Sequence, residues 1–298
     1  ALPLPVLLIV APSWEWVVAG NILLGVNQGL TWSMAVNAKI DLAGPDQRGL
    51  AVGIDESFGY TGVAVGSWLT GVIAARSALR PEPFVFMGAV VLLAFLLSVV
   101  LVKETLQYAR AEGDASDRDA NLPFGDVLKR ATYGDRTLFA AAQAGHVENF
   151  VDTLFWIGVP LYLVTQGLGP AAIGLVVGVH SGMYFLQIGT GGLADRIGRR
   201  PPVIAGMYLA GLGVLGMVLA EGYVLWLLMA AVSGLGMALL YPNLMTVPGD
   251  ACHPSWRASG MGVYRMWRDA GYGVGAIVIG LTMEFASIEA AFYLTAAL

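Results

Sequence analysis

Eight long apolar runs dominate the chain, and a helix needs about 20 apolar residues to cross a bilayer. The runs cover residues 14–38, 49–75, 84–102, 138–165, 171–192, 202–220, 223–247 and 258–282. Charged residues make up 12% of the chain, about half of the roughly 25% that is usual in soluble domains. Because lipid offers no hydrogen bonds to an open backbone, runs of this length predict helices. The sequence therefore predicts an all-α integral membrane protein and excludes a soluble globular one.

Apolar residues also stand at both ends of the chain, at Leu2–Ala11 and Ala290–Leu298. Each of these stretches is too short to span a bilayer. The first stretch has neither the charged segment nor the small-residue cleavage site of a secretory signal. We expect the sequence to be a piece of a longer protein, cut within a membrane helix at each end.

One connection, residues 103–137, is much longer than the others and carries charges of both signs. Within it Phe124, Val127, Leu128 and Ala131 recur at the spacing of one helix face. This pattern predicts a short helix lying on the membrane surface, with a plain loop as the alternative.

Lysine and arginine are unevenly divided between the two sides of the membrane. On one side, the loops contain only Arg76 and Arg80. Twelve of the sixteen basic residues fall in the loops of the other side, which are 39–48, 103–137, 193–201 and 248–257. Because basic loops stay in the cytoplasm, we expect this second side to be cytoplasmic. We expect a multi-pass protein of the cell membrane, in a bacterium the inner membrane.

The chain contains an internal repeat. Residues 41–71 align without gaps on residues 250–280, and eight of the 31 positions are identical. The identical pairs are Asp41 and Asp250, Pro45 and Pro254, Arg48 and Arg257, Gly53 and Gly262, Gly62 and Gly271, Val65 and Val274, Gly66 and Gly275, and Gly71 and Gly280. Both copies run from a basic loop into a span, which indicates two halves related by an axis along the membrane normal. We expect the glycines inside the spans to allow close helix packing.

A loop with a strict pattern lies between the spans at 171–192 and 202–220. Its defining residues are Gly182, Gly191, Asp195, Arg196, Gly198, Arg199 and Arg200. It resembles the signature loop of the major facilitator superfamily, G-x8-G-x3-D-[RK]-x-G-R-[RK], and it matches every defined position. The preference of basic residues for the cytoplasm accounts for the arginines, but not for the spaced glycines or for Asp195.

The resemblance implies two pseudo-symmetric six-helix bundles joined by a long cytoplasmic loop. It implies that the chain runs from the end of helix 3 to the start of helix 12. On this interpretation residues 1–102 are a partial N-terminal bundle, residues 103–137 are the interbundle loop, and residues 138–298 are the C-terminal bundle.

The resemblance also implies that the signature loop takes part in gating. In the family, the aspartate at the position of Asp195 faces the N-terminus of a helix in the opposite half. By the repeat, that helix is the one expected to begin near Gly49. The helix dipole favours a carboxylate there by about 0.3–1 kcal/mol. The three arginines of the loop are either topology anchors or members of the same charge relay.

Ionisable residues inside the spans are candidates for function because each is unfavourable in lipid. Glu148 and Asp152 are four residues apart and share a helix face, about 15–22 Å deep at 1.5 Å per residue. Desolvation and mutual repulsion favour proton binding at such a pair. We expect at least one of them to couple transport to protons. The alternative is a structural pair, bonded to neighbours such as Asn149 or neutralised by an arginine.

A second group of charges lies in the two spans that carry the repeat. Arg265 and Asp269 are spaced to form an ion pair within one helix. Arg268 would then pair with Asp55 or Glu56 across the two halves, as a gate, or with an anionic substrate. Asp55 and Glu56 are also further candidates for proton coupling.

Polar residues of the spans are candidates for lining a substrate cavity. These candidates are Asn27, Gln28, His146, Asn149, Arg265, Arg268 and Asp269.

The resemblance implies a secondary transporter that works by alternating access. We expect proton-coupled export of a small organic molecule by antiport, because Gly62, Gly66 and Gly71 resemble the family's antiporter motif without its proline and terminal glycine pair. The alternative is proton-coupled uptake of an organic anion bound by Arg265 and Arg268. The sequence has no motif of an enzyme active site, a cofactor or metal site, or a nucleic-acid-binding module. The expected partners are a small molecule, protons and lipid, and we expect a monomer.

Overall fold

A computed structural model describes residues 2–78, 80–115 and 121–298, and these are almost entirely helical. The helices are α1 (Pro3–Val10), α2 (Trp14–Ala43), α3 (Arg48–Arg76), α4 (Glu82–Leu101), α5 (Leu106–Asp114), α6 (Phe124–Lys129), α7 (Arg136–Thr153), α8 (Val159–Thr165), α9 (Pro170–Gly182), α10 (Gln187–Ile197), α11 (Arg200–Leu219), α12 (Tyr223–Ala251), α13 (Arg257–Phe285) and α14 (Ile288–Ala297). No strand is found among these described residues, and the all-α fold class is confirmed. Three charged residues of the long loop, Asp117, Arg118 and Asp119, lie outside the described part of the chain.

A helix lies at each of the eight predicted spans. Five helical segments are long and apolar enough to cross a membrane, namely Glu82–Leu101, Arg136–Thr165, Ala171–Ile197, Arg200–Leu219 and Tyr223–Ala251. Helices α2, α3 and α13 have 30, 29 and 29 residues, so they are also long enough, but they contain more charged residues. The chain is therefore a multi-pass membrane protein whose most polar long helices are those of the repeat and α2.

Two of the long helices are interrupted by an irregular turn. A π-helical turn, Leu154–Gly158, joins α7 to α8. Pro160 follows this turn, and a proline displaces the carbonyl four residues before it, which here belongs to Trp156. A 3₁₀ turn, Met183–Leu186, joins α9 to α10. Irregular turns of this kind often lie at functional sites.

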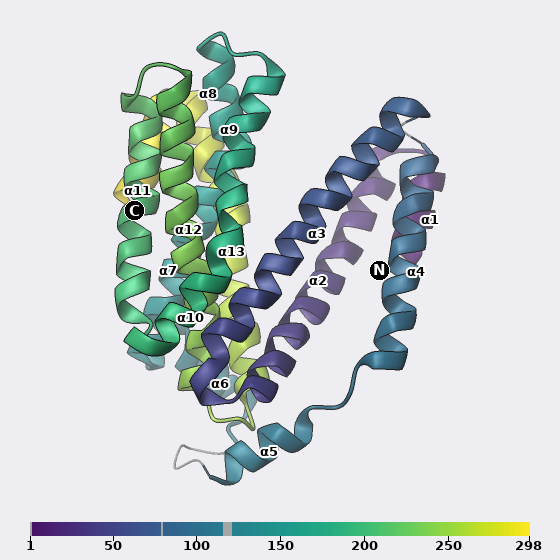
Figure 1. The fold of residues 1–298 in the computed structure, drawn as a ribbon, viewed down its shortest axis with the longest axis vertical. Helices are drawn as coiled ribbons and strands as arrows, with labels where there is room; N and C mark the ends of the chain where they lie inside the picture. The colour runs from purple at the N-terminus through teal and green to yellow at the C-terminus, as the bar shows by residue number, and fades with distance from the viewer. Residues whose placement is uncertain (1, 79, 116–120) are drawn as a thin grey trace.

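The helices form two groups that meet at one end and diverge toward the other (Figure 1). One group contains α1–α4, and the other contains α7–α14. Where they meet, α3 packs against α10 and α12, and α2 packs against α13. This end contains the first turns of α3 and α13 and the loop from α10 to α11, with Arg48, Arg257 and Arg199. We call it the basic end.

The main apolar core lies within the second group of helices. Three side chains of the first group join this core: Val36 and Ile40 of α2 and Val52 of α3, each with 0% of its surface exposed. The contact between the two groups near the basic end therefore has a dry, apolar part as well as the charges described below.

The long loop contains two short helices, α5 and α6, of which only α6 was expected. Val127 and Ala131 are fully buried and pack with Leu138 and Trp256 of the second group. Placing these two side chains against the membrane surface was wrong, because helical spacing of apolar residues does not distinguish contact with lipid from contact with protein. Phe124, on the same face by sequence spacing, is 63% exposed.

The expected role of the repeat glycines is only partly right. Gly271 and Gly275 pack closely on α7, where a side chain at Gly271 would lie 3.0 Å from Asn149 Cβ. A side chain at Gly62, Gly66 or Gly280 would meet no atom within 4 Å in the described part of the chain.

Candidate functional site

The signature loop lies at the basic end and reaches the first turn of α3. Both carboxylate oxygens of Asp195 accept backbone N–H groups, from Gly49 and from Leu50, at 2.8 Å each. The first N–H groups of a helix have no partner within it, and Gln47 before α3 supplies no side-chain cap. Asp195 of α10 therefore caps a helix of the other group. The contact expected for Asp195 with the helix that begins near Gly49 is present.

The glycines of the signature loop have different surroundings. Gly191 lies so close to the backbone of Gly49 that a side chain at either position would overlap the other helix. Gly198 ends α10 with a φ of +87°, a conformation that favours glycine. Gly182 ends α9 and has open space around its Cα.

The three arginines of the loop do not act alike. Arg199 Nη1 lies 2.6 Å from Asp195 Oδ1, and its Nε donates to Asp250 Oδ2 at 3.1 Å. Arg196 and Arg200 are exposed. Of the two interpretations offered for these residues, the charge relay fits Arg199, and the topology anchor fits the other two.

The charges of the internal repeat pair across the two groups of helices. Arg48 at the start of α3 donates to Asp250 at the end of α12, at 3.1 Å. Arg257 at the start of α13 donates to Asp41 at the end of α2, at 2.8 Å. Each arginine thus bonds the aspartate of the other repeat copy. Both guanidinium groups are at most 3% exposed, so water screens these pairs little.

Glu112 of α5 joins the two symmetry-related arginines. Its Oε1 accepts from Arg257 Nη2 at 2.5 Å and also from Arg48 Nη2. Burial acts to raise the pKa of Glu112, but the hydrogen bonds from Arg257 and Arg48 outweigh burial and hold this pKa below the ordinary glutamate value. One carboxylate therefore connects the N-termini of α3 and α13.

Neither Glu112 nor the cross-pairing of the repeat was predicted from the sequence. The repeat did contain a usable signal, because Asp41 and Arg48 align on Asp250 and Arg257, so each copy has one charge of each sign at the same end. Nothing in the long loop marks Glu112 among its other acidic residues.

Within the membrane, Glu148 is neutralised by arginine, which was the alternative to proton coupling at that residue. Its two oxygens accept from Arg268 Nε at 3.1 Å and Arg268 Nη2 at 3.2 Å. Arg268 also donates to Asp269 at 2.9 Å and lies over the ring of Tyr241, 4.2 Å from its centroid. Both Glu148 and Arg268 are buried, with 0% and 2% of their surfaces exposed.

Asp152 has different partners, although it shares the helix face of Glu148. It accepts hydrogen bonds from the hydroxyls of Tyr184 and Tyr272, the latter at 3.0 Å. His180 Nε2 lies 3.5 Å away, and all of Asp152 is buried. In the described part of the chain no lysine or arginine forms an ion pair with Asp152.

The gate expected between Arg268 and the acids of α3 is not formed, and this part of the prediction is wrong. Glu56 accepts from the indole of Trp32 at 2.7 Å, and Asp55 pairs with Lys39. The repeat alignment gave no rotation of α13 about its axis, and this rotation turns the guanidinium of Arg268 toward α7.

The remaining expected contact of α13 is present, since Arg265 Nη2 lies 3.0 Å from Asp269 Oδ2. His146 and Asn149 of α7, predicted to line a cavity, bond the neighbouring helix α13. Their side chains bond the backbone oxygens of Trp267 and Arg268, both at 2.9 Å, and tie α7 to α13.

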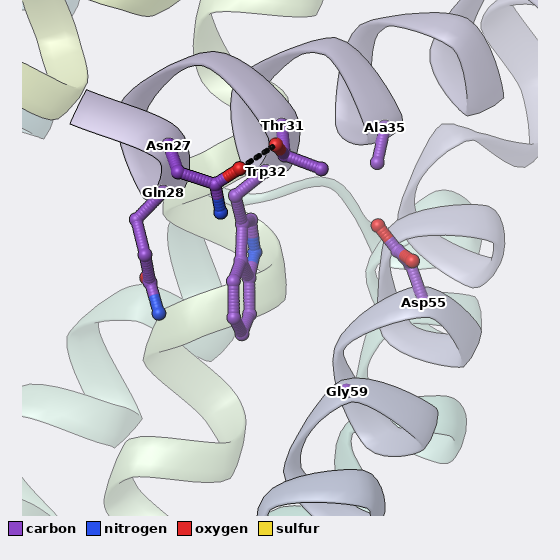
Figure 2. Close-up of a pocket in the computed structure, with 7 residues that line it drawn as sticks. All are labelled: Asn27, Gln28, Thr31, Trp32, Ala35, Asp55 and Gly59. Carbon is purple, nitrogen blue, oxygen red and sulfur yellow. Dashed lines mark hydrogen bonds between the residues drawn. The ribbon is translucent and has the colours of Figure 1, made fainter. Parts of the chain in front are cut away.

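A pocket of about 240 Å³ lies between α2 and α3 (Figure 2). Its lining residues are Asn27, Gln28, Thr31, Trp32, Ala35, Asp55 and Gly59. The pocket therefore brings together two of the predicted cavity residues with one predicted proton-coupling residue. One indole, two amides and one carboxylate suit a small amphipathic molecule.

Comparisons with known proteins agree with the fold. The family model described as Major Facilitator Superfamily matches residues 1–147 and 144–298. An uncharacterized MFS-type transporter of Bacillus subtilis, YdeG, is 30% identical over 208 residues, which is 67% of this chain and 48% of that protein. The multidrug resistance protein MdtH of Cronobacter sakazakii is 33% identical over 144 residues, 46% of this chain and 31% of the relative. The inner membrane transport protein YnfM of Escherichia coli is 30% identical over 122 residues, 40% of this chain and 29% of the relative. The matched segments cover about half of the first relative and less of the others.

Proposed function

Because this chain belongs to the major facilitator superfamily, we propose that it is part of a proton-coupled transporter that exports a small organic molecule by antiport. Members of the family are in general carriers of small molecules embedded in a membrane, and not enzymes. The observation that carries the proton coupling is the fully buried carboxylate of Asp152 on α7, with which no lysine or arginine of the described residues forms an ion pair. Such groups are unfavourable inside a membrane protein unless a function retains them.

Export is supported by two observations of lower specificity. A distant relative is named a multidrug resistance protein, and the glycine series of α3 resembles the antiporter motif of the family. The relative YnfM is named an inner membrane transport protein, which supports a bacterial inner membrane for this chain. We propose that one copy of the full-length protein is sufficient for transport.

The charges at the basic end form the proposed gate on the cytoplasmic side. The members are Asp41, Arg48, Glu112, Asp195, Arg199, Asp250 and Arg257. They connect the two groups of helices at the end where these groups meet, and the groups diverge at the other end (Figure 1). In this conformation the gate is closed, and opening it requires these bonds to exchange for water.

The α2–α3 pocket is the proposed contribution of this part of the chain to substrate binding. Asn27 and Gln28 supply amides that accept and donate hydrogen bonds, and Trp32 supplies an aromatic wall. Asp55 places a carboxylate at the same pocket, paired with Lys39.

One observation favours the alternative, uptake of an organic anion. Arg265 Nε is buried and has no hydrogen-bond partner, so this guanidinium retains a free donor for an anion. Arg268 is less suitable, because Glu148, Asp269 and the ring of Tyr241 already surround it.

The direct test measures proton and substrate fluxes together. The full-length protein is placed in proteoliposomes with an imposed pH gradient, and a panel of small organic cations, neutral molecules and anions is screened. Antiport predicts substrate moving opposite to protons. An anion moving together with protons would support the alternative, and substrate flux that ignores the pH gradient would exclude proton coupling.

A further inference from the structure

We propose that His180, Tyr184 and Asp152 form a proton relay, in which a proton enters at the imidazole of His180 and is held on Asp152. This inference rests on the proposed function and deepens it, because it names the groups that bind the coupled proton. It also assigns Glu148 to a fixed ion pair with Arg268.

The two carboxylates of α7 differ in how they are neutralised. Glu148 is held by two hydrogen bonds from one guanidinium, at 3.1 and 3.2 Å, which is the arrangement that stabilises an ionised carboxylate most strongly. Protonating Glu148 would weaken this pair and leave Asp269, at 2.9 Å, as the remaining carboxylate partner of Arg268, which is 2% exposed. The pair of Glu148 and Arg268 therefore anchors α13 to α7.

Asp152 keeps hydrogen-bond partners in both protonation states. Its oxygens are bonded by the hydroxyls of Tyr184 and Tyr272. A hydroxyl donates to an ionised carboxylate and accepts from a protonated one, so neither state leaves an oxygen of Asp152 without a partner. A group that gains and loses a proton in every cycle needs this property.

Tyr184 connects Asp152 to His180. The hydroxyl oxygen of Tyr184 lies 3.1 Å from His180 Nε2. The hydroxyl has one proton, which it donates to Asp152, so it accepts its second hydrogen bond from Nε2–H. This assignment leaves Nδ1 as the nitrogen of His180 without a proton, and Nδ1 is buried with no hydrogen-bond partner among the described residues. Phe155, stacked on the imidazole at 3.7 Å, fixes its orientation.

The proton count of the relay is balanced. A proton binds to Nδ1, the Nε2 proton moves to the oxygen of Tyr184, and the hydroxyl proton of Tyr184 moves to Asp152. The products are a neutral imidazole protonated at Nδ1, a neutral tyrosine and a protonated Asp152. One proton has entered, and the charge of the three groups has risen from about −1 to about 0. The reverse sequence releases the proton.

The relay also touches the other group of helices. The ring of Tyr60 on α3 packs edge-on against Tyr184, with 4.8 Å between ring centroids. Tyr184 lies in the 3₁₀ turn between α9 and α10, and Asp152 lies two residues before the π-helical turn. Both residues therefore lie where a helix is irregular. Tyr184 also contacts the α1–α4 group, and separation of the two groups of helices would expose it.

Other titratable or charged side chains surround the relay, and each is accounted for. They are Glu148 on α7, Arg268, Asp269 and Tyr272 on α13, Tyr241 on α12, and Tyr60 on α3. The single cation among them, Arg268, is bonded to Glu148 and Asp269.

The test uses the full-length transporter in proteoliposomes, with proton flux, substrate flux and substrate counterflow measured on the same preparation. Tyr184→Phe keeps the ring that packs on Tyr60 and removes only the hydroxyl. We expect it to lower proton-driven flux about tenfold or more while counterflow continues. Asp152→Asn should abolish net proton movement while counterflow continues. Tyr162→Phe, at a buried tyrosine of α8, is the matched control and should couple like the wild type.

Each outcome has one meaning. If the wild type does not couple proton and substrate fluxes, the proposed function fails, and the relay fails with it. If the wild type couples but Tyr184→Phe and Asp152→Asn both couple normally, the relay alone is wrong. Loss of coupling in Glu148→Asp together with normal coupling in Asp152→Asn would also overturn it and assign the proton to Glu148. Counterflow in each variant shows that the protein has inserted and folded.

Discussion

At the basic end, Asp195 has fixed partners on another helix, because each of its oxygens bonds one backbone N–H of α3. Asparagine has nearly the same shape, but its NH₂ group cannot accept a hydrogen bond. Asp195→Asn should weaken the contact by about 1 kcal/mol, since it also loses the charge at a helix N-terminus. We expect the variant to have a smaller fraction of molecules in the conformation that is closed at the basic end, and slower transport at equal expression.

The matched control is Asp46→Asn, which removes a carboxylate from an exposed position at the same end. This control should transport like the wild type. Normal transport by Asp195→Asn would show that the cap is not part of the gate.

A second prediction concerns Gly191, which lies against the backbone of Gly49. The methyl group of Gly191→Ala would overlap α3, and overpacking of this kind costs about 1–3 kcal/mol. The variant should separate α10 from α3 and lower the melting temperature of the detergent-solubilised protein. Gly189→Ala, on the same helix with open space around it, should leave the melting temperature nearly unchanged or raise it. Equal melting temperatures of the two variants would contradict the close contact.

The contacts of a single residue could be predicted where a sequence motif contained that residue. They could not be predicted where the contact depended on the rotation of a helix about its axis. The pattern around Asp195 was sufficient to predict its contact with the helix that begins near Gly49. Spacing alone placed Arg268 opposite Asp55 and Glu56, whereas its partner is Glu148. The choice depends on which face of α13 meets α7, and the spacing of the charged residues within α13 does not determine that rotation.

At the scale of elements, α5 closes the basic end by joining the first turns of α3 and α13 through Glu112. Glu112→Gln removes the charge that two buried arginines share, and a hydrogen bond to a charged group contributes about 1.5–3 kcal/mol. We expect the variant to favour the conformation that is open at this end. Distances between spin labels across the basic end should lengthen. Asp114→Asn, at an exposed position of the same helix, should leave these distances unchanged. Unchanged distances in Glu112→Gln would show that Glu112 does not hold the basic end closed.

The contribution of Glu112 to closing the basic end depends on pH with a definite sign. The pKa of Glu112 is held low in the closed form, so its contribution is present above the ordinary glutamate pKa and is lost as pH falls through the lowered value. In an Asp152→Asn background, the difference in closed fraction between proteins with Glu112 and with Glu112→Gln should stay constant from about pH 8 to about pH 5, and be lost only below the ordinary glutamate pKa of about 4.3. A midpoint near neutral pH would contradict the assigned partners of Glu112.

Elements were predictable from hydropathy when they cross the membrane. All eight spans contain helices, because a long apolar run has no other way to satisfy its backbone in lipid. The short helices of the long loop were harder. The α6 helix was expected, but Val127 and Ala131 face protein, and α5 has too little apolar character to be recognised.

At the scale of the whole molecule, the two copies of the sequence repeat form a symmetric set of contacts at the closed end. Arg48 and Arg257 occupy equivalent positions, and each pairs with the aspartate of the other copy. The two groups of helices are therefore joined by reciprocal bonds, with Glu112 between them. Such bonds can break together, which is what a gate between two rigid halves requires.

In the proposed transport cycle, the basic end is closed while the opposite end is open, and the two ends alternate between these states. Double electron–electron resonance on the full-length protein tests it, with one spin-label pair at positions 46 and 197 of the basic end and another at positions 76 and 166 of the opposite end. All four positions are exposed, and the single cysteine, Cys252, is buried. On adding substrate and protons, the distances at the two ends should change in opposite directions, and Glu112→Gln should lengthen the first and shorten the second. Distances that change in the same direction, or not at all, would contradict alternating access through this gate.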